Sequence, residues 1–352
     1  MAKQKSSFLR KVFLSIVVLV VLIMAIGAYL TYTTLYQPNV NLGEKKSAFI
    51  YIPTGSRFED VLRILVENNF LKKTSTFEWL AEKKAYKNAV KPGKYRLLAS
   101  MNNSALINLL KGGIQEPVDI NFTGLHTVDQ LVARVGRRLE ADSASLYKAV
   151  HDAEFTRKYG FLPTEIQALF IPTNYQLMWN TSVDEFFDRV AKDYSNFWTE
   201  ERKNKAKQIG FSQTEVSVLA SIVQGEQCCD NEEKRIIAGL YINRLKKDMP
   251  LQSDPTVIFA IGNFSIQRVS IEQTRVSSPY NTYENKGLPP GPVGFAQAST
   301  LDAVLNYSKN DYLYMCAKEN LSGKHNFAKS YEQHLVNRKK YREALNARNI
   351  HS

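Results

Sequence analysis

The chain has 352 residues, of which 44% are hydrophobic and 23% are charged, and its formal net charge is +12. This length allows two domains of ordinary size, and the composition excludes a mainly disordered protein. A basic chain often binds nucleic acid, but we find no helix-turn-helix, zinc-finger spacing or aromatic RNA-binding signature, so we expect no nucleic-acid partner.

The first predicted element is an uncharged apolar stretch at residues 12–32, which follows a short basic tail at residues 1–11. At a rise of about 1.5 Å per residue it can cross the roughly 30 Å core of a bilayer. It is longer than the core of a cleaved signal peptide, roughly 7 to 15 residues, and no small-x-small cleavage site follows it. We therefore expect a single-pass anchor.

The basic tail indicates the orientation of this anchor. By the positive-inside rule, the N-terminus stays in the cytoplasm and the larger part of the chain lies outside the cytoplasmic membrane. The tail owes its charge to four residues: Lys3, Lys5, Arg10 and Lys11. The exported part keeps a positive charge that suits anionic lipid headgroups or an anionic wall polymer.

Residues 33–47 are polar and aperiodic, which predicts a linker. A small α+β module is expected over residues 48–115, because short alternating runs and amphipathic runs follow one another there. Its predicted elements are a strand at Ala48–Ile52, helices at Phe58–Asn68 and Ser75–Lys84, a strand within Val90–Leu97 and a helix at Ser104–Lys111.

The remainder, residues 116–352, predicts a larger mixed α+β domain. Its most informative part is one long helical pattern from Thr214 to about Lys247, and its longest loop runs from Tyr280 to Pro292. Loops of that length in compact domains are usually functional. The other predicted elements are a strand at Val118–Phe122, helices at Leu131–Leu139, Val183–Tyr194 and Leu301–Leu305, a strand at Tyr312–Ala317 and a basic terminal helix.

The cysteines and histidines predict no metal site. Cys228, Cys229 and Cys316 form no CxxC pair, and neighbouring cysteines rarely bridge each other, so we expect small buried side chains and no disulfide. His325 and His334 are nine residues apart and match no zinc-binding spacing. We expect neither a metal nor a cofactor.

Glu226 is the strongest candidate for chemistry. Leu219, Ile222 and Val223 mark the apolar face of a helix, and Glu226 takes the next position on that face. A carboxyl there either forms a structural salt bridge, for example with Arg244, or lines a cavity with a raised pKa and can donate a proton. The spacing leaves both interpretations open.

Five motifs, in this order, resemble the YceG-like (MltG) family of endolytic transglycosylases: LASIVQGE at 219–226, INRL at 242–245, MPLQSDPTV at 249–257, YNTY at 280–283 and GLPPGP at 287–292. The resemblance extends to an N-terminal anchor, a LysM-like module at residues 48–113 and a Pro-x-x-Tyr element at Pro172–Tyr175. Two departures are Gln224-Gly225 in place of a charged pair, and Gly294–Gln297 in place of Asn-Pro-Gly.

The resemblance implies a lytic cut of peptidoglycan. Glu226 protonates the oxygen between MurNAc and GlcNAc, then takes the proton of the muramyl 6-hydroxyl, which attacks its own anomeric carbon and leaves a 1,6-anhydro end. An internal nucleophile removes the need for the second carboxylate of ordinary glycosidases. Asp254 is the candidate if a second carboxylate takes part, and its alternative role is to cap a turn or the helix that begins at Pro255.

Neutral side chains that hydrogen-bond or stack on sugars are the candidates for substrate binding, although each suits ordinary loop bonding as well. They are Tyr175, Asn243, Gln252, Tyr280, Asn281 and Thr282, and the charged Asp254 is a further candidate for direct contact with the substrate. The implied partners are glycan strands, the cytoplasmic membrane and, by family analogy, peptidoglycan synthases. The alternative function is a non-catalytic peptidoglycan-binding scaffold for such synthases.

Overall fold

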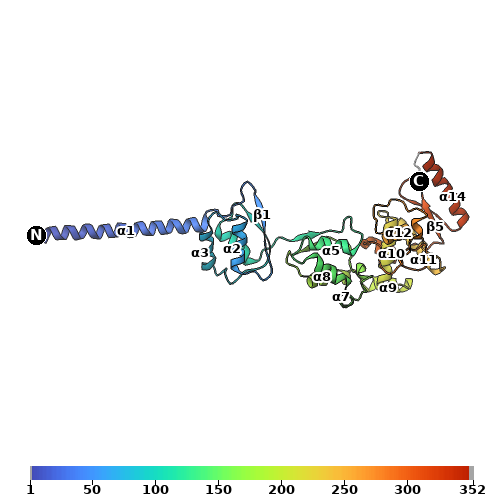
Figure 1. Ribbon diagram of the computed structural model, residues 1–352, viewed down its shortest axis with the longest axis horizontal. Coiled ribbons are helices and arrows are strands. Elements are labelled where there is room, and N and C mark those ends of the chain that lie inside the picture. Colours follow the sequence, from blue (N-terminus) through green and yellow to red (C-terminus); the bar gives the residue numbers. More distant parts are fainter. Residues whose placement is uncertain (1, 349–352) are drawn as a thin grey trace. The chain divides into compact units, whose positions relative to one another are not determined.

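The computed structural model describes residues 2–348, and their side chains from residue 10 onward. These residues form two compact units (Figure 1). The first unit runs to Val118 and includes Gln176–Asn180. The second contains Asp119–Tyr175 and continues from Thr181. The predicted α+β class is confirmed, since short two-stranded sheets lie among many helices.

The chain begins with the long helix α1 (Ala2–Tyr36). Its apolar part, Arg10–Tyr36, covers 27 residues with a mean hydropathy of 2.9 and includes the predicted span at residues 12–32. The side chains of residues 10–32 are exposed, and Leu22, Ile23 and Met24 are each more than half exposed, whereas Leu35 packs against the core of the module. An exposed apolar surface of this length suits the hydrocarbon core of a membrane.

The rest of the first unit contains a small α+β module. Its antiparallel sheet pairs β1 with β2, from Ser47 opposite Leu98 to Ile52 opposite Gly93. Alternate strand residues point into an apolar core that the helices complete. The elements are β1 (Ser47–Ile52), α2 (Phe58–Glu67), α3 (Thr74–Lys83), β2 (Gly93–Leu98) and α4 (Asn103–Gly112). The LysM-like character of this module stays a prediction.

The segment that the sequence assigns to a linker is partly built into this module. Helix α1 continues to Tyr36, and Val40 is only 1% exposed. The backbone N–H groups of Asn39 and Val40 both donate to the Met101 carbonyl. A periodicity argument misses such a segment because two isolated bridges, and not a regular strand, hold it.

The second unit is mainly helical, with one antiparallel hairpin that pairs β5 with β6 near its C-terminal end. The short strands β3 (Val118–Ile120) and β4 (Tyr175–Leu177) lie where the chain passes from one unit to the other. The remaining elements are α5 (Val128–Gly136), α6 (Ser143–His151), α7 (Ala153–Lys158), η1 (Ile166–Leu169), α8 (Val183–Phe197), α9 (Glu200–Ile209), α10 (Gln213–Glu226), α11 (Asn231–Lys246), α12 (Asp254–Ile261), η2 (Gln273–Arg275), α13 (Ala298–Leu305), β5 (Tyr314–Ala317), β6 (His325–Ala328) and α14 (Tyr331–Asn346).

The core of this unit surrounds α10, which packs against α11 and α13. The helix starts at a capping box, in which Ser212 and Glu215 each accept the backbone N–H of the other. Every residue from Val216 to Val223 is buried, so α10 is a central helix and not a surface one. Its last residue is Glu226.

The single long helix predicted from Thr214 to Lys247 is wrong, because two helices, α10 and α11, occupy this range. Gln227 has an extended backbone that ends α10. The Asp230 side chain then accepts the N–H groups of Glu232 and Glu233 and starts α11. The break ends α10 directly after the candidate acid.

The prediction for two of the cysteines is also wrong. Cys228 and Cys229 are bonded to each other as a disulfide, and both are exposed. Cys316 is the free cysteine of the chain and is half-buried. The rule that neighbours rarely bridge fails here because the two residues lie in the irregular segment between α10 and α11, where no helical geometry holds their side chains apart.

Candidate active site

Glu226 lies at the wall of a hollow of about 270 Å³, which we call the acid hollow. This hollow is lined by the end of α10, the C-terminal half of α11, the segment from Leu251 to the start of α12, and Tyr283. The hairpin β5–β6 contributes Cys316 and His325. The Glu226 side chain is partly exposed, so a ligand in the hollow can touch it.

Two neutral hydroxyl groups hold the Glu226 carboxyl. Its Oε1 accepts hydrogen bonds from the Tyr241 hydroxyl at 2.8 Å and from the Ser253 hydroxyl at 2.6 Å. Burial raises the pKa of Glu226 above its ordinary value, and the Asp254 charge raises it further, whereas the two hydroxyl bonds and His325 lower it. Burial is the largest of these influences, so the carboxyl holds its proton to a higher pH than an exposed glutamate.

The structure rules against a salt bridge between Glu226 and Arg244. The Arg244 guanidinium donates instead to the carbonyls of Leu313, Pro250 and Leu251. Within residues 2–348, no lysine, arginine or histidine forms an ion pair with Glu226. Of the two interpretations that the sequence leaves open, the geometry favours a protonatable acid.

Asp254 also lines the acid hollow, at the first residue of α12. Its Oδ1 accepts the Tyr283 hydroxyl at 2.7 Å, and burial raises its pKa. The residue at the cap position of α12 is Ser253, whose hydroxyl is directed to Glu226. The Asp254 carboxyl therefore faces the hollow and Tyr283, and its charge acts on Glu226.

A buried network fixes Ser253, which is 0% exposed. Its backbone N–H donates to the Thr282 hydroxyl at 3.1 Å, and its carbonyl accepts the Thr256 hydroxyl at 2.6 Å. Gln252 precedes it with a φ of 49°, and its N–H donates to the Thr282 carbonyl. These bonds aim the Ser253 hydroxyl at the acid, so Thr282 supports the site without facing the hollow.

The predicted site residues thus divide into two groups. Glu226, Gln252 and Asp254 line the acid hollow. The others have contacts that shape loops: Asn243 donates to Asn310 and Tyr312, Asn281 donates to Thr274 and Val276, Tyr280 packs on Phe259, and Tyr175 is buried beside Phe122 with its hydroxyl 3.4 Å from the Ile171 carbonyl.

Sequence reasoning missed three side chains that act on Glu226. Tyr241 and Ser253 touch Glu226 itself, and His325 lies close enough to lower its pKa. The His325 Nδ1 lies 2.8 Å from the Glu233 carboxylate, which fixes the ring. The available signal was the i, i+4 spacing of Ile237 and Tyr241 on α11, which places a phenol on a buried helix face.

A second hollow has a volume of about 310 Å³. Gly225 and Pro255 line it, and their chain neighbours Glu226 and Asp254 line the acid hollow. We call it the ring hollow, after the His126 and Phe264 rings that stack 4.2 Å apart in its wall. Burial lowers the pKa of His126, so its ring stays neutral near pH 7. Flat neutral rings are suited to packing against a sugar face.

A third hollow, of about 610 Å³, shares Leu125, Gln224 and Phe295 with the ring hollow and is called the middle hollow. Thr173 and Asn174, from the Pro-x-x-Tyr element, form another part of its wall. Both departures from the family pattern, at Gln224 and at Phe295, therefore lie where these two hollows meet. Neither departure contacts the Glu226 carboxyl in the described part of the chain.

Most of the chain is similar to known proteins. The chain is 30% identical over 338 residues to a Bacillus subtilis (strain 168) protein named endolytic murein transglycosylase, and the match covers 91% of each chain. A Streptococcus pneumoniae (strain D39) protein of the same name is 28% identical over 84% of this chain and 58% of its own length.

A solved structure is similar as well. The crystal structure of a yceG-like protein from Listeria monocytogenes has a TM-score of 0.55 and 26% identity, and the match covers 83% of this chain and 99% of that one. The YceG-like family itself matches residues 50–340, which is most of the sequence. This chain therefore belongs to the YceG-like family.

Proposed function

We propose that this protein is a membrane-anchored endolytic murein transglycosylase that cuts between MurNAc and GlcNAc in glycan strands. The observation that carries the proposal is Glu226, a carboxyl with a raised pKa, held by two neutral hydroxyl groups at the wall of a hollow. The names of the Bacillus and Streptococcus relatives support the same activity.

The reaction is a proton relay through one carboxyl. Protonated Glu226 gives its proton to the glycosidic oxygen as the bond from that oxygen to the muramyl anomeric carbon breaks. The resulting carboxylate then removes the proton of the muramyl 6-hydroxyl, whose oxygen bonds to the same carbon. The products are a free GlcNAc hydroxyl and a 1,6-anhydro end, Glu226 regains its proton, and no water is consumed.

Tyr241 and Ser253 matter most between the two proton transfers. A buried carboxylate is costly without hydrogen-bond donors, and these two hydroxyls already point at Oε1. Burial and Asp254 favour the protonated form, while the hydroxyls favour the ionised form. The site therefore suits a group that must hold both states in turn.

We propose that α1 anchors the enzyme in the cytoplasmic membrane with its N-terminus in the cytoplasm. The two units then lie on the outer face, where newly made strands emerge. A reporter fused after residue 40 tests this orientation, and a cytoplasmic reporter signal would contradict it. Peptidoglycan synthases are proposed partners by family analogy only.

The decisive experiment uses the full-length protein in detergent micelles on uncrosslinked glycan strands, with products read by mass spectrometry. We expect anhydro-muramyl ends, one water lighter than reducing ends, and none with Glu226→Gln, which keeps the shape but cannot donate the proton. Reducing ends would indicate hydrolysis with Asp254 as a second carboxylate. Binding without any cleavage would favour the non-catalytic scaffold.

A further inference from the structure

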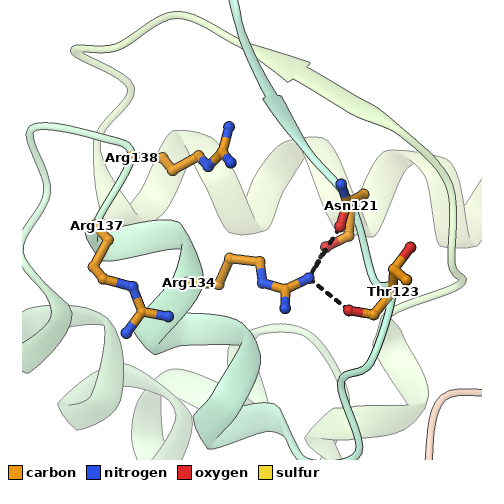
Figure 2. Close-up of a pocket in the computed structure, with 5 residues that line it drawn as sticks. All are labelled: Asn121, Thr123, Arg134, Arg137 and Arg138. Atoms are coloured by element: carbon orange, nitrogen blue, oxygen red, sulfur yellow. Dashed lines mark hydrogen bonds between the residues drawn. The ribbon is translucent and has the colours of Figure 1, made fainter.

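A fourth hollow in the second unit, of about 410 Å³, is lined by arginines and polar residues, and we call it the arginine hollow. Its wall consists of Asn121, Thr123, Arg134, Arg137 and Arg138. Figure 2 shows Arg134 extending toward Asn121 and Thr123, with the Arg137 and Arg138 guanidinium groups on either side of it. Three cationic side chains thus face one open space.

The contacts of these arginines keep much of their hydrogen-bonding capacity available. Arg134 donates from one nitrogen to the Asn121 and Thr123 carbonyls and to the Asn121 side-chain oxygen, all of them neutral acceptors. Arg138 donates to the Asp119 carbonyl at 3.3 Å. Each guanidinium carries five N–H donors. Because these contacts use few of them, donors remain for an anion in the hollow.

The end of α5 offers a simpler explanation, since the C-terminal turn of a helix attracts cations. That explanation does not account for the contacts, which run from Arg134 and Arg138 to residues 119–123 and not to the last carbonyls of the helix. It also does not account for the hollow. Arg134 instead holds the segment that forms the opposite wall.

The arginine hollow continues toward the acid. It shares Asn121 and Thr123 with the middle hollow, which in turn shares Leu125, Gln224 and Phe295 with the ring hollow next to Glu226. All four hollows belong to the second unit. An extended polymer that lies along these three linked hollows reaches Gly225, the residue before Glu226.

We infer that the arginine hollow binds a carboxylate of a stem peptide on the glycan strand whose backbone is cut at Glu226. The inference rests on the proposed function, because a muramyl strand carries such peptides at regular intervals. A planar guanidinium matches a carboxylate through two parallel hydrogen bonds, which an uncharged sugar cannot offer. Asn121 and Thr123 supply polar contacts for the peptide beside it.

The test compares the full-length protein on two preparations of the same uncrosslinked strands. In one the peptide carboxylates are free, and in the other carbodiimide and ammonia have converted them to primary amides. We expect amidation to raise the KM of the natural sequence about tenfold, the effect of losing one well-formed charged hydrogen-bond pair, with kcat little changed. Arg137→Gln/Arg138→Gln should show the higher KM on both preparations.

The matched control is Lys340→Gln/Arg342→Gln, which removes the same charge from exposed positions of α14. For this variant, the KM for amidated strands should remain about tenfold higher than the KM for strands with free carboxylates. Arg137→Lys/Arg138→Lys keeps the charge without the planar fork and should recover only part of the distinction. Melting temperatures of all variants separate a folding defect from a binding defect.

Two results would overturn the inference. One is an equal KM for free and amidated strands with the natural sequence. The other is that Arg137→Gln/Arg138→Gln leaves the KM for strands unchanged and weakens only the binding of vesicles with anionic phospholipid or of inorganic phosphate. That result would assign the hollow to a phosphate group. Both leave the anhydro products intact, whereas a failure of the proposed function would remove the products from every preparation.

Discussion

The acid hollow and the arginine hollow lie in the same unit but differ in how their charged groups are placed. At Glu226 a single ionisable group is surrounded by buried neutral hydroxyls, so burial sets its behaviour. In the arginine hollow permanent charges stand near solvent, and Arg137 and Arg138 are exposed. The first arrangement tunes a proton equilibrium, and the second provides attraction without tuning any proton. Substitutions and salt should therefore separate them.

Among variants that keep Glu226, the largest expected effect comes from removing both hydroxyls that face it. Tyr241→Phe/Ser253→Ala leaves the carboxylate without its donors, at a cost of about 1–3 kcal/mol for each lost bond, so we expect kcat to fall about 100-fold. Because both bonds lower the pKa of Glu226, their loss raises it, and the alkaline limb of kcat/KM moves to higher pH. The pH profile of anhydro-product formation measures both effects.

Tyr175→Phe is the matched control for the loss of a phenol hydroxyl. Tyr175 is buried, and its hydroxyl bonds to the Ile171 carbonyl and not to the acid. The alkaline limb of kcat/KM for Tyr175→Phe should lie at the same pH as for the natural sequence. If the alkaline limb of Tyr241→Phe/Ser253→Ala also stayed at that pH, the two hydroxyls would not control the proton on Glu226.

Asp254→Asn should shift the alkaline limb of kcat/KM in the opposite direction, to lower pH. The Asp254 charge raises the pKa of Glu226, so its removal lowers that pKa, as expected for the loss of a nearby like charge. Less of the enzyme is then protonated at neutral pH, and we expect about a tenfold loss of kcat/KM there. The amide retains an oxygen for the Tyr283 hydroxyl.

Asp311→Asn removes an exposed carboxylate that pairs with Lys329, and it should leave the limb in place. An upward shift with Asp254→Asn would contradict the assigned influence of this charge. A loss of product at every pH, with no shift of the limb, would instead indicate that Asp254 acts directly on the substrate.

Much of the fold and the acid itself could be predicted from local patterns. The helix beginning at Phe58 and the strand around Ile50 follow from regular spacing of apolar residues. Glu226 is detectable because a carboxyl interrupts an apolar helix face, which is costly without a purpose. The catalytic role proposed for it rests on the resemblance of nearby motifs to those of the family.

The partners of the acid could not be predicted this way. Tyr241 lies 15 residues from Glu226 and Ser253 lies 27 residues away, and only tertiary packing brings their hydroxyls to Oε1. In the sequence, the first resembles core filling and the second a helix cap. The arginine hollow has the same difficulty, because Arg134, Arg137 and Arg138 look like an ordinary solvated helix face until residues 119–123 are packed opposite them.

A change in salt concentration should have a smaller effect, which differs between the arginine hollow and the acid hollow. Raising the ionic strength from about 0.05 to 0.5 M shortens the screening length to about 4 Å, which weakens exposed charges far more than buried ones. We expect the KM for strands with free carboxylates to rise about threefold, because Arg137 and Arg138 are exposed. The alkaline limb set by Glu226 should move much less.

Amidated strands are the control for this salt titration, since they offer the arginines no anion. Their KM should change little over the same range. An equal rise for both preparations would show that salt weakens strand binding in general, and it would remove the distinction between the two hollows.

The smallest effect concerns the disulfide directly after the acid. Cys228 and Cys229 are exposed, whereas Gln227 is buried and holds this segment through its side chain. Its oxygen accepts the Cys229 N–H, and its nitrogen donates to Glu233 and to the Gly323 carbonyl. These bonds do not depend on the disulfide. Cys228→Ser/Cys229→Ser should therefore change kcat/KM less than about twofold, as is usual for substitutions at the surface.

Alkylation followed by mass measurement checks the bridge itself. Without reductant, the unfolded natural sequence should take one alkyl group, at Cys316, and after reduction it should take three. Three groups without reductant would show that the bridge is absent. A tenfold loss of activity in the serine variant would show that the bridge, and not Gln227, keeps the end of α10 in place, and the position of Glu226 would then depend on the redox state of its surroundings.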